Sequence, residues 1–173
     1  MINLRTEGAG VQIRAFNELA AADAAGLVRA CADIDAWVDA VVIGRPFDDL
    51  AALTAYAERQ AATWTGDEIE AALADHPRIG ERHSGGGASA SMSRQEQSGV
   101  GDDEDVKARL AEGNRRYEAR FHRIYLVRAA GRTAEEMLAM LDDRLTNDPE
   151  TELKVTGGQL AEIAVLRLKG LFT

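Results

Sequence analysis

Apolar residues recur every three to four positions along most of the chain, which is the spacing of one face of an α-helix. Only 5% of the residues are aromatic and only three are proline, which favours helices over strands. We therefore expect an all-α, single-domain bundle of about seven to eight helices. The pattern predicts helices over about residues 15–29, 32–43, 50–64, 68–75, 102–127, 133–145 and 150–171.

Two of these predicted helices carry informative ends. Thr133 followed by Glu136 forms a capping-box pattern, which typically begins a helix. The end of the 102–127 stretch, from Ile124 to Val127, is rich in β-branched and aromatic residues. This part therefore fits extended chain as well as helix.

The helical pattern fails between His76 and Gly101, where glycine, serine and proline are concentrated. We expect a long polar loop between residues 76 and 101, with room for one helical turn. Loops of this length inside a compact domain are usually functional or disordered. This stretch is therefore the first place to search for chemistry.

The chain has 173 residues, of which 29 are acidic and 20 are basic, for a net charge of −9. This length fits one domain over residues 1–173, with residues 1–12 as a flexible or loosely packed N-terminus. An acidic chain lacks the basic footprint that binds phosphates, so we expect no nucleic-acid partner.

Cysteine content and hydropathy bear on the compartment. A single cysteine cannot form an internal disulfide, which suits a reducing environment. No apolar run approaches the roughly 18 residues that span a bilayer, and the first ten residues lack an apolar signal core. We expect a cytoplasmic protein that does not engage a membrane.

His76 is a candidate for proton transfer, because histidine titrates near neutral pH. It stands at a predicted helix-to-loop junction, and Pro77 restricts its backbone to extended conformations. The alternative is a surface histidine that ends a helix, where the helix dipole favours it.

The run Ser93-Arg94-Gln95-Glu96-Gln97 also has two readings. Serine followed three residues later by glutamate is a capping box, which needs no function. In the functional reading, a helix N-terminus offers free N–H groups to an anion. Ser93, Glu96 and Gln97 would then add a hydroxyl, a carboxylate and an amide, which suits a small substrate rich in N–H and C=O groups.

Arg167 interrupts an apolar stripe, since it lies seven residues after Leu160 and four before Leu171. An inward arginine needs an anionic or polar partner. That partner is either an internal carboxylate or a substrate carboxylate, unless the side chain reaches out to solvent. The three histidines match no compact metal-ligand spacing, so we expect no metal.

The ordered set of motifs resembles the 2-oxo-4-hydroxy-4-carboxy-5-ureidoimidazoline (OHCU) decarboxylase family, from about Asn17 to Leu168. The motifs are Gly-Arg-Pro-Phe at 44–47, His-Pro-Arg-Ile-Gly at 76–80, Ser-Arg-Gln-Glu-Gln at 93–97, Asn114-x-x-Tyr117-x-x-x-Phe121, and Glu162-Ile163 with Arg167-Leu168. Such enzymes complete the conversion of urate to (S)-allantoin.

The resemblance implies an all-helical homodimer that acts on a small ureide without metal or organic cofactor. It implies that His76 is the catalytic acid or base, and our hypothesis adds Glu96 to the proton-transfer work. Substrate contacts would come from Pro77, Ser93, Arg94, Gln95, Glu96, Gln97 and Arg167, and from main-chain groups of Tyr125, Leu126, Val127, Arg128 and Ala129.

One departure from the family pattern stands beside this last segment. The family often has Phe-Gly-Phe-Pro-Phe, whereas this chain has Phe121-His122-Arg123-Ile124-Tyr125. Two other functions compete with the decarboxylase. One is a hydrolase acting on a related ureide, which would normally need a metal or a nucleophile. The other is a non-enzymatic helical module whose acidic surface meets a basic partner.

Overall fold

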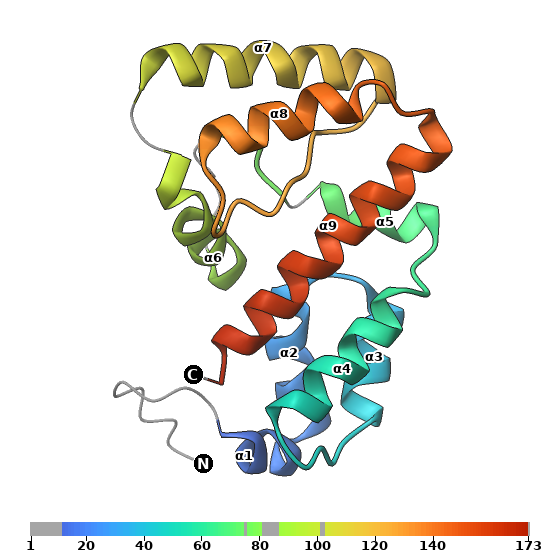
Figure 1. The fold of residues 1–173 in the computed structure, drawn as a ribbon. Helices are drawn as coiled ribbons and strands as arrows, with labels where there is room; N and C mark the ends of the chain where they lie inside the picture. The colour runs from blue at the N-terminus through green and yellow to red at the C-terminus, as the bar shows by residue number, and fades with distance from the viewer. Residues whose placement is uncertain (1–11, 75, 81–86, 101–102, 173) are drawn as a thin grey trace. The chain divides into compact units, whose positions relative to one another are not determined.

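The computed structural model describes residues 12–74, 76–80, 87–100 and 103–172. In these ranges it contains nine α-helices, one 3-10 helix and no strand, so the predicted all-α class is confirmed (Figure 1). Most of the predicted N-terminal segment 1–12 lies outside the described residues. None of the described helices has both the length and the hydropathy needed to cross a membrane.

The chain forms two compact units. One unit is built from the chain up to Thr63 together with the chain from Ile163 onward, and the other is Trp64–Glu162. The last helix contributes residues to both. No observation tests the prediction of a single domain over 1–173, which stays a prediction.

The first unit begins with four helices: α1 (Ile13–Glu18), α2 (Ala21–Cys31), α3 (Asp35–Ile43) and α4 (Leu50–Ala61). The single helix predicted over 15–29 is wrong, because the chain is extended at Leu19 and Ala20, where ψ is 146°. Arg45 explains the break, since its Nη1 donates to the carbonyl oxygens of Phe16 at 2.8 Å and Leu19 at 2.9 Å. A tertiary contact thus satisfies carbonyls that a continuous helix would have satisfied itself.

The second unit contains α5 (Gly66–Leu73), α6 (Ala88–Glu96), the 3-10 helix η1 (Gln97–Val100), α7 (Glu104–Phe121), α8 (Ala134–Arg144) and the larger part of α9 (Pro149–Gly170). The capping box predicted at Thr133 and Glu136 is confirmed at the start of α8. Asp148 caps α9 by accepting from the N–H of Thr151 at 3.0 Å, and hydrogen bonds from Thr151 lower the pKa of the Asp148 carboxyl.

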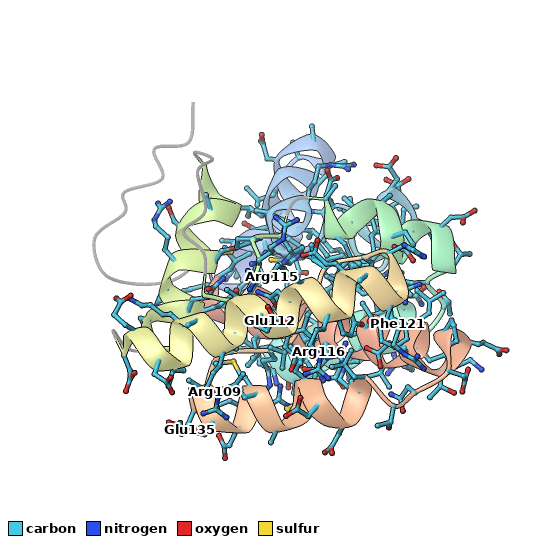
Figure 2. The ribbon with its side chains drawn as sticks, turned by 90° about the horizontal axis from the view of Figure 1, so that it is seen from above. Arg109, Glu112, Arg115, Arg116, Phe121 and Glu135 are labelled. Carbon is cyan, nitrogen blue, oxygen red and sulfur yellow. The ribbon has the colours of Figure 1, made fainter. Side chains whose placement is uncertain are left out.

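The helices α7 and α8 lie side by side (Figures 1 and 2) and supply most of the residues in the core of the second unit. The core residues are Ile79, Val106, Leu110, Tyr117, Phe121, Tyr125, Val127, Ala129, Ala134, Met137, Leu138 and Leu141. On its outer side, α7 carries exposed charged residues, of which Figure 2 labels Arg109, Glu112, Arg115 and Arg116.

The expectation of a polar loop with one helical turn between 76 and 101 is wrong for residues 88–100, which form α6 and η1. The buried side of α6 includes Ala90 and Ser93, which are 1% and 3% exposed. Because these residues are small or polar, hydropathy periodicity does not reveal the helix. Other residues of the predicted loop, 81–86 and 101, lie outside the described part.

The interpretation of Ser93 and Glu96 as a capping box at the start of a helix is also wrong. Ser93 lies within α6, whose N-cap position is Gly87, and Glu96 is its last residue. Gly87 has a φ of 102°, a conformation that glycine adopts at little cost. The functional reading that placed a free helix N-terminus at Ser93 loses its basis for the same reason.

Candidate functional site

His76 follows the last turn of α5, where its main-chain N–H donates to the carbonyl of Leu73 at 3.0 Å. His76 and Pro77 are both half-buried. The predicted junction between a helix and non-helical chain is therefore confirmed. Its role in proton transfer stays a prediction at this point.

Two residues of α7 hold the chain immediately after Pro77. Asn114 is buried and donates from Nδ2 to the main-chain carbonyl of Ile79 at 3.1 Å. Glu118 pairs with Arg78, with its carboxylate oxygens 2.5 and 3.0 Å from Nε and Nη2. The position of the turn that carries His76 is thus set by the long surface helix of the unit.

A third contact ties this turn to the run Ser93–Gln97. The main-chain N–H of Gly80 donates to Oε1 of Gln97 at 3.0 Å. The structure therefore joins the 76–80 turn to the C-terminal end of α6, as a shared site requires. It also shows that the amide oxygen of Gln97 already has a protein partner.

Members of the run differ in exposure. Ser93 is buried, Glu96 and Gln97 are half-buried, and Arg94 and Gln95 are exposed. The exposed guanidinium of Arg94 donates to Oγ of Ser91 at 3.1 Å. Ser93, Glu96 and Gln97 are thus the members best placed to line an enclosed site. Substrate contacts by Arg94 and Gln95 stay predictions.

The segment Tyr125–Ala129 is neither helix nor strand, so the helix predicted to run to Val127 is wrong beyond Phe121, where α7 ends. Tyr125, Leu126, Val127 and Ala129 are buried, and Tyr125 donates from its hydroxyl to the carbonyl of Met137 at 2.8 Å. Burial raises the pKa of the Tyr125 phenol far above its usual value. A buried irregular segment needs partners for its peptide groups.

Side chains from outside the segment supply several of these partners. Arg144 donates from Nη1 to the carbonyl of Leu126 at 2.7 Å. Gln159 accepts from the N–H of Arg128 at 3.0 Å. Arg132 donates from Nη1 to the carbonyl of Arg128 at 2.9 Å, and its main-chain N–H donates to the carbonyl of Ala129 at 3.1 Å.

Other peptide groups of the segment have no such partner. The N–H groups of Leu126, Val127 and Ala129 make no hydrogen bond to any residue in the described part of the chain. This segment therefore has main-chain donors without a protein partner among the described residues, and their contact with a substrate stays a prediction. The N–H of Arg128 is not among them, because Gln159 accepts from it.

Sequence reasoning missed Arg132, Arg144 and Gln159. The sequence did contain a signal for Arg144, because it follows Met137 and Leu141 on the apolar stripe of α8. In the structure Arg144 is 5% exposed, as that position predicts. The same kind of signal singled out Arg167. Nothing in the local sequence pattern marks Arg132 or Gln159. Gln159 acts on an N–H 31 residues away, and Arg132 acts on a carbonyl four residues before it in non-helical chain.

Arg167 lies in α9 and is 5% exposed, so the inward orientation predicted from the stripe is confirmed. It belongs to the unit that resumes at Ile163, whereas His76 and the 93–97 run belong to the other unit. Its binding role stays a prediction. In the described part of the chain, no three His, Cys, Asp or Glu side chains are grouped closely enough to hold a metal ion.

Comparison with known proteins extends these observations. The family model described as OHCU decarboxylase matches residues 17–169, which include every predicted site residue. The uric acid degradation bifunctional protein TTL of Arabidopsis thaliana is 33% identical over 106 residues, covering 59% of this chain. The match spans 33% of the plant protein, so this chain corresponds to about a third of its length.

Two solved structures share the fold, both with a TM-score of 0.69. A crystal structure of OHCU decarboxylase in the presence of (S)-allantoin is 25% identical and covers 83% of this chain and 95% of its own. A crystal structure of (S)-allantoin synthase is 17% identical and covers 94% of this chain and 54% of its own, and supports the fold alone. Because the family model spans nearly the whole sequence, this chain belongs to the OHCU decarboxylase family.

Proposed function

We propose that this protein is a cofactor-independent carboxy-lyase that converts OHCU to (S)-allantoin in the degradation of urate. The observation that carries the proposal is the family match over residues 17–169. The solved relative whose structure was determined in the presence of (S)-allantoin supports a small ureide as the substrate. The tie between the His76 turn and α6 supports a shared site.

The reaction breaks the bond between the substrate ring and its carboxylate. Carbon dioxide leaves, and the bonding electrons remain on the ring carbon, where they delocalise into the adjacent C=N system. The electrons form a double bond to the neighbouring, ureido-bearing carbon, and the ring nitrogen takes up a proton. The hydroxyl then releases its proton and becomes the ring carbonyl, while a proton adds to the ureido-bearing carbon and gives allantoin. The ring itself accepts the electrons, so an organic electron sink is not required.

The side chains divide this work as follows. His76 and Glu96 activate the hydroxyl of the substrate and deliver the proton to one face of the ring. Ser93, Gln97 and Pro77 enclose the ring, and Arg167 orients an anionic or carbonyl group of the substrate. Protonation from a fixed side produces one enantiomer, whereas spontaneous decay gives both.

Main-chain donors complete the proposed site. The N–H groups of Leu126, Val127 and Ala129 have no hydrogen-bond partner in the described structure. They bind oxygens of the ring or ureido group, where the developing negative charge is distributed. Fixed N–H donors stabilise such charge because they need no reorientation during the reaction.

The decisive experiment follows optical activity after the protein is mixed with OHCU freshly generated from urate. Wild-type protein should give (S)-allantoin well above the spontaneous rate, and His76→Asn should lower kcat by about 10²-fold or more with an unchanged melting temperature. His122→Asn is the matched control, because His122 is exposed at the end of α7. Racemic product at the spontaneous rate from the wild type would reject the decarboxylase assignment.

We further propose that the enzyme is a homodimer and acts in the cytoplasm. The family resemblance supports the dimer, and light scattering coupled to size-exclusion chromatography tests it by giving twice the 18.7 kDa chain mass. Cys31 is buried and is the single cysteine of the sequence, so it cannot form an internal disulfide, which is consistent with a reducing compartment. Imaging of a tagged chain in its source cell tests the compartment.

A further inference from the structure

Each nitrogen of the Arg144 guanidinium has a partner in the interior of the second unit. Nε and Nη2 lie 2.7 and 2.6 Å from Oε1 of Glu152, which is fully buried. Nη2 is also 3.2 Å from Oγ1 of Thr156. Nη1 donates to the main-chain carbonyl of Leu126 at 2.7 Å. One side chain of α8 therefore connects α9 to the segment Tyr125–Ala129.

The carboxylate of Glu152 is equally well supplied. Tyr117 donates its hydroxyl proton to Oε1, and Asn147 donates from Nδ2 to Oε2 at 2.8 Å. The Arg144 guanidinium also lies over the Tyr125 ring, 4.8 Å from its centroid. Burial and the hydrogen bond to Glu152 raise the pKa of Tyr117, so the hydroxyl stays protonated and continues to donate.

Stability alone is a weak reason for this arrangement. Removing two charges from water is costly, and replacing a buried ion pair by apolar residues of similar volume is often neutral or stabilising. An apolar pair at Arg144 and Glu152 could not, however, donate to the carbonyl of Leu126. Compared with such an apolar pair, the feature that Arg144 adds is its hydrogen bond to the peptide carbonyl of Leu126.

The geometry of a peptide bond makes this contact consequential. The carbonyl of Leu126 and the N–H of Val127 belong to one planar group. This bond is trans, because the only cis peptide in the described chain is Arg45–Pro46. In a trans peptide the carbonyl and the N–H point in opposite directions. By fixing the carbonyl, Arg144 therefore fixes the direction of the Val127 N–H, which has no protein partner among the described residues.

The same device occurs two residues later. Arg132 donates from Nη1 to the carbonyl of Arg128 at 2.9 Å, which fixes the direction of the Ala129 N–H. Gln159 supports Arg132 by accepting from the same Nη1 at 2.8 Å. Glu162 lies 3.7 Å from Nη2 of Arg132 and contacts no peptide group of the segment. Two arginines thus act on two alternate peptide groups.

We propose that Arg144 and Arg132 are positioning residues that aim the N–H groups of Val127 and Ala129 at an electron-rich oxygen of the substrate. The inference rests on the proposed function and adds a mechanism by which the donors are oriented before the substrate arrives. Donors held in this way stabilise developing negative charge, so the arginines contribute to kcat without touching the substrate.

Arg132 offers the gentler test, because its side chain is 18% exposed. Arg132→Met should lower kcat by about 10²-fold, the usual effect of losing one such donor, and should change KM much less. Arg132→Lys should recover part of the activity, since its ammonium group can donate to the same carbonyl. Glu162→Gln is the matched control, which alters the charge around Arg132 and leaves the peptide contact in place.

Arg144 is tested by the double variant Arg144→Met, Glu152→Leu, which avoids leaving a buried unpaired charge. Its kcat should also fall by about 10²-fold. Tyr117→Phe is the control, because it removes a hydroxyl from the same buried network and keeps the contact between Arg144 and Leu126. This control should lower the melting temperature and retain the wild-type kcat.

Amide NMR separates positioning from general loosening of the fold. Titration of ¹⁵N-labelled wild-type protein with (S)-allantoin should shift the Val127 and Ala129 resonances. Arg132→Met should lose the Ala129 shift, and the Arg144 double variant should lose the Val127 shift. The inference would be overturned, with the proposed function left intact, by folded variants that keep both kcat and the amide shifts. It would also be overturned by a wild type that turns over OHCU without shifts at these two amides. A wild type that neither forms nor binds (S)-allantoin would overturn the proposed function, and the inference with it.

Discussion

Asn114, on α7, donates from its side-chain amide to the main-chain carbonyl of Ile79 at 3.1 Å, across 35 residues of sequence. This hydrogen bond is buried, and its acceptor, Ile79, is three residues after His76 in the sequence. It gives the turn that carries His76 a fixed attachment to the core of its unit.

Asn114→Ala should therefore affect both stability and activity. Leaving the Ile79 carbonyl without a donor should lower the free energy of unfolding by about 1–3 kcal/mol, and a loosened His76 turn should lower kcat. Urea unfolding and the (S)-allantoin assay measure the two effects. Glu118→Gln is the control on the same helix, because the pair it weakens with Arg78 is partly exposed and contributes little. Equal effects from both variants would contradict a special role for Asn114.

His122 ends α7 in the left-handed conformation, with a φ of 56° and a ψ of 27°. Glycine adopts this conformation without the steric cost of a Cβ atom, so His122→Gly should raise the free energy of unfolding by about 1 kcal/mol. Gly131, with a φ of 77°, provides the reverse comparison, and Gly131→Ala should be destabilising. Chemical denaturation that shows no gain for His122→Gly would argue against strain at this position.

Gly157 and Gly158 are neighbours in α9 but differ in their surroundings. A Cβ at Gly158 would meet no atom within 4 Å, whereas a Cβ at Gly157 would lie 2.7 Å from Cδ1 of Ile69. Gly158→Ala should therefore stabilise the helix by about 1 kcal/mol. Gly157→Ala should gain less or be destabilising, because Ile69 must move.

Thermal unfolding of the two alanine variants, measured side by side, checks this difference. Helix propensity is nearly the same for both, so the gap in melting temperature reports on packing against Ile69 alone. Identical melting temperatures would show that Ile69 moves aside at no cost.

Tyr117 and Tyr125 predict a loss of stability at alkaline pH. Burial raises the pKa of both phenols in the folded protein, whereas in the unfolded chain they ionise near pH 10. Above about pH 10 the unfolded state therefore releases protons that the folded state keeps, so the free energy of unfolding falls as pH rises. Below that pH the two phenols contribute no pH dependence.

Tyr125→Phe isolates one of these contributions. The variant should be less stable at pH 8, because it loses the hydrogen bond to the Met137 carbonyl. Its stability should then fall less steeply between pH 9.5 and 11 than that of the wild type. Urea unfolding across this range measures both slopes, and parallel curves would contradict the assignment.

Much of the fold was accessible from the sequence, because apolar spacing marks helices such as α7 and α8 and a capping box marks the start of α8. Two errors have physical causes. The helix predicted over 15–29 is divided by Arg45, a contact between distant residues. Helix α6 was missed because Ala90 and Ser93, on its buried side, carry no strong hydropathy signal.

The candidate site was predictable to the extent that side chains carry it. His76, Glu96 and Arg167 are chemically distinctive, and the motifs around them pointed to one family. The attachments of the site were not predictable, because Asn114 acts on a carbonyl 35 residues away and Gln159 on an N–H 31 residues away. Such pairings depend on which elements become neighbours in space.

The segment Tyr125–Ala129 has a consequence for how this family varies. In the proposed site this segment contributes peptide groups, which every residue except proline supplies in full. We therefore expect the side chains of this segment to vary among relatives as long as they fill the core, where Tyr125, Leu126, Val127 and Ala129 are buried. Under the proposed mechanism the constraint falls instead on Arg132 and Arg144, which contact peptide carbonyls of the segment. A survey of relatives should then find stronger selection at these two arginines than at the side chains of the segment itself.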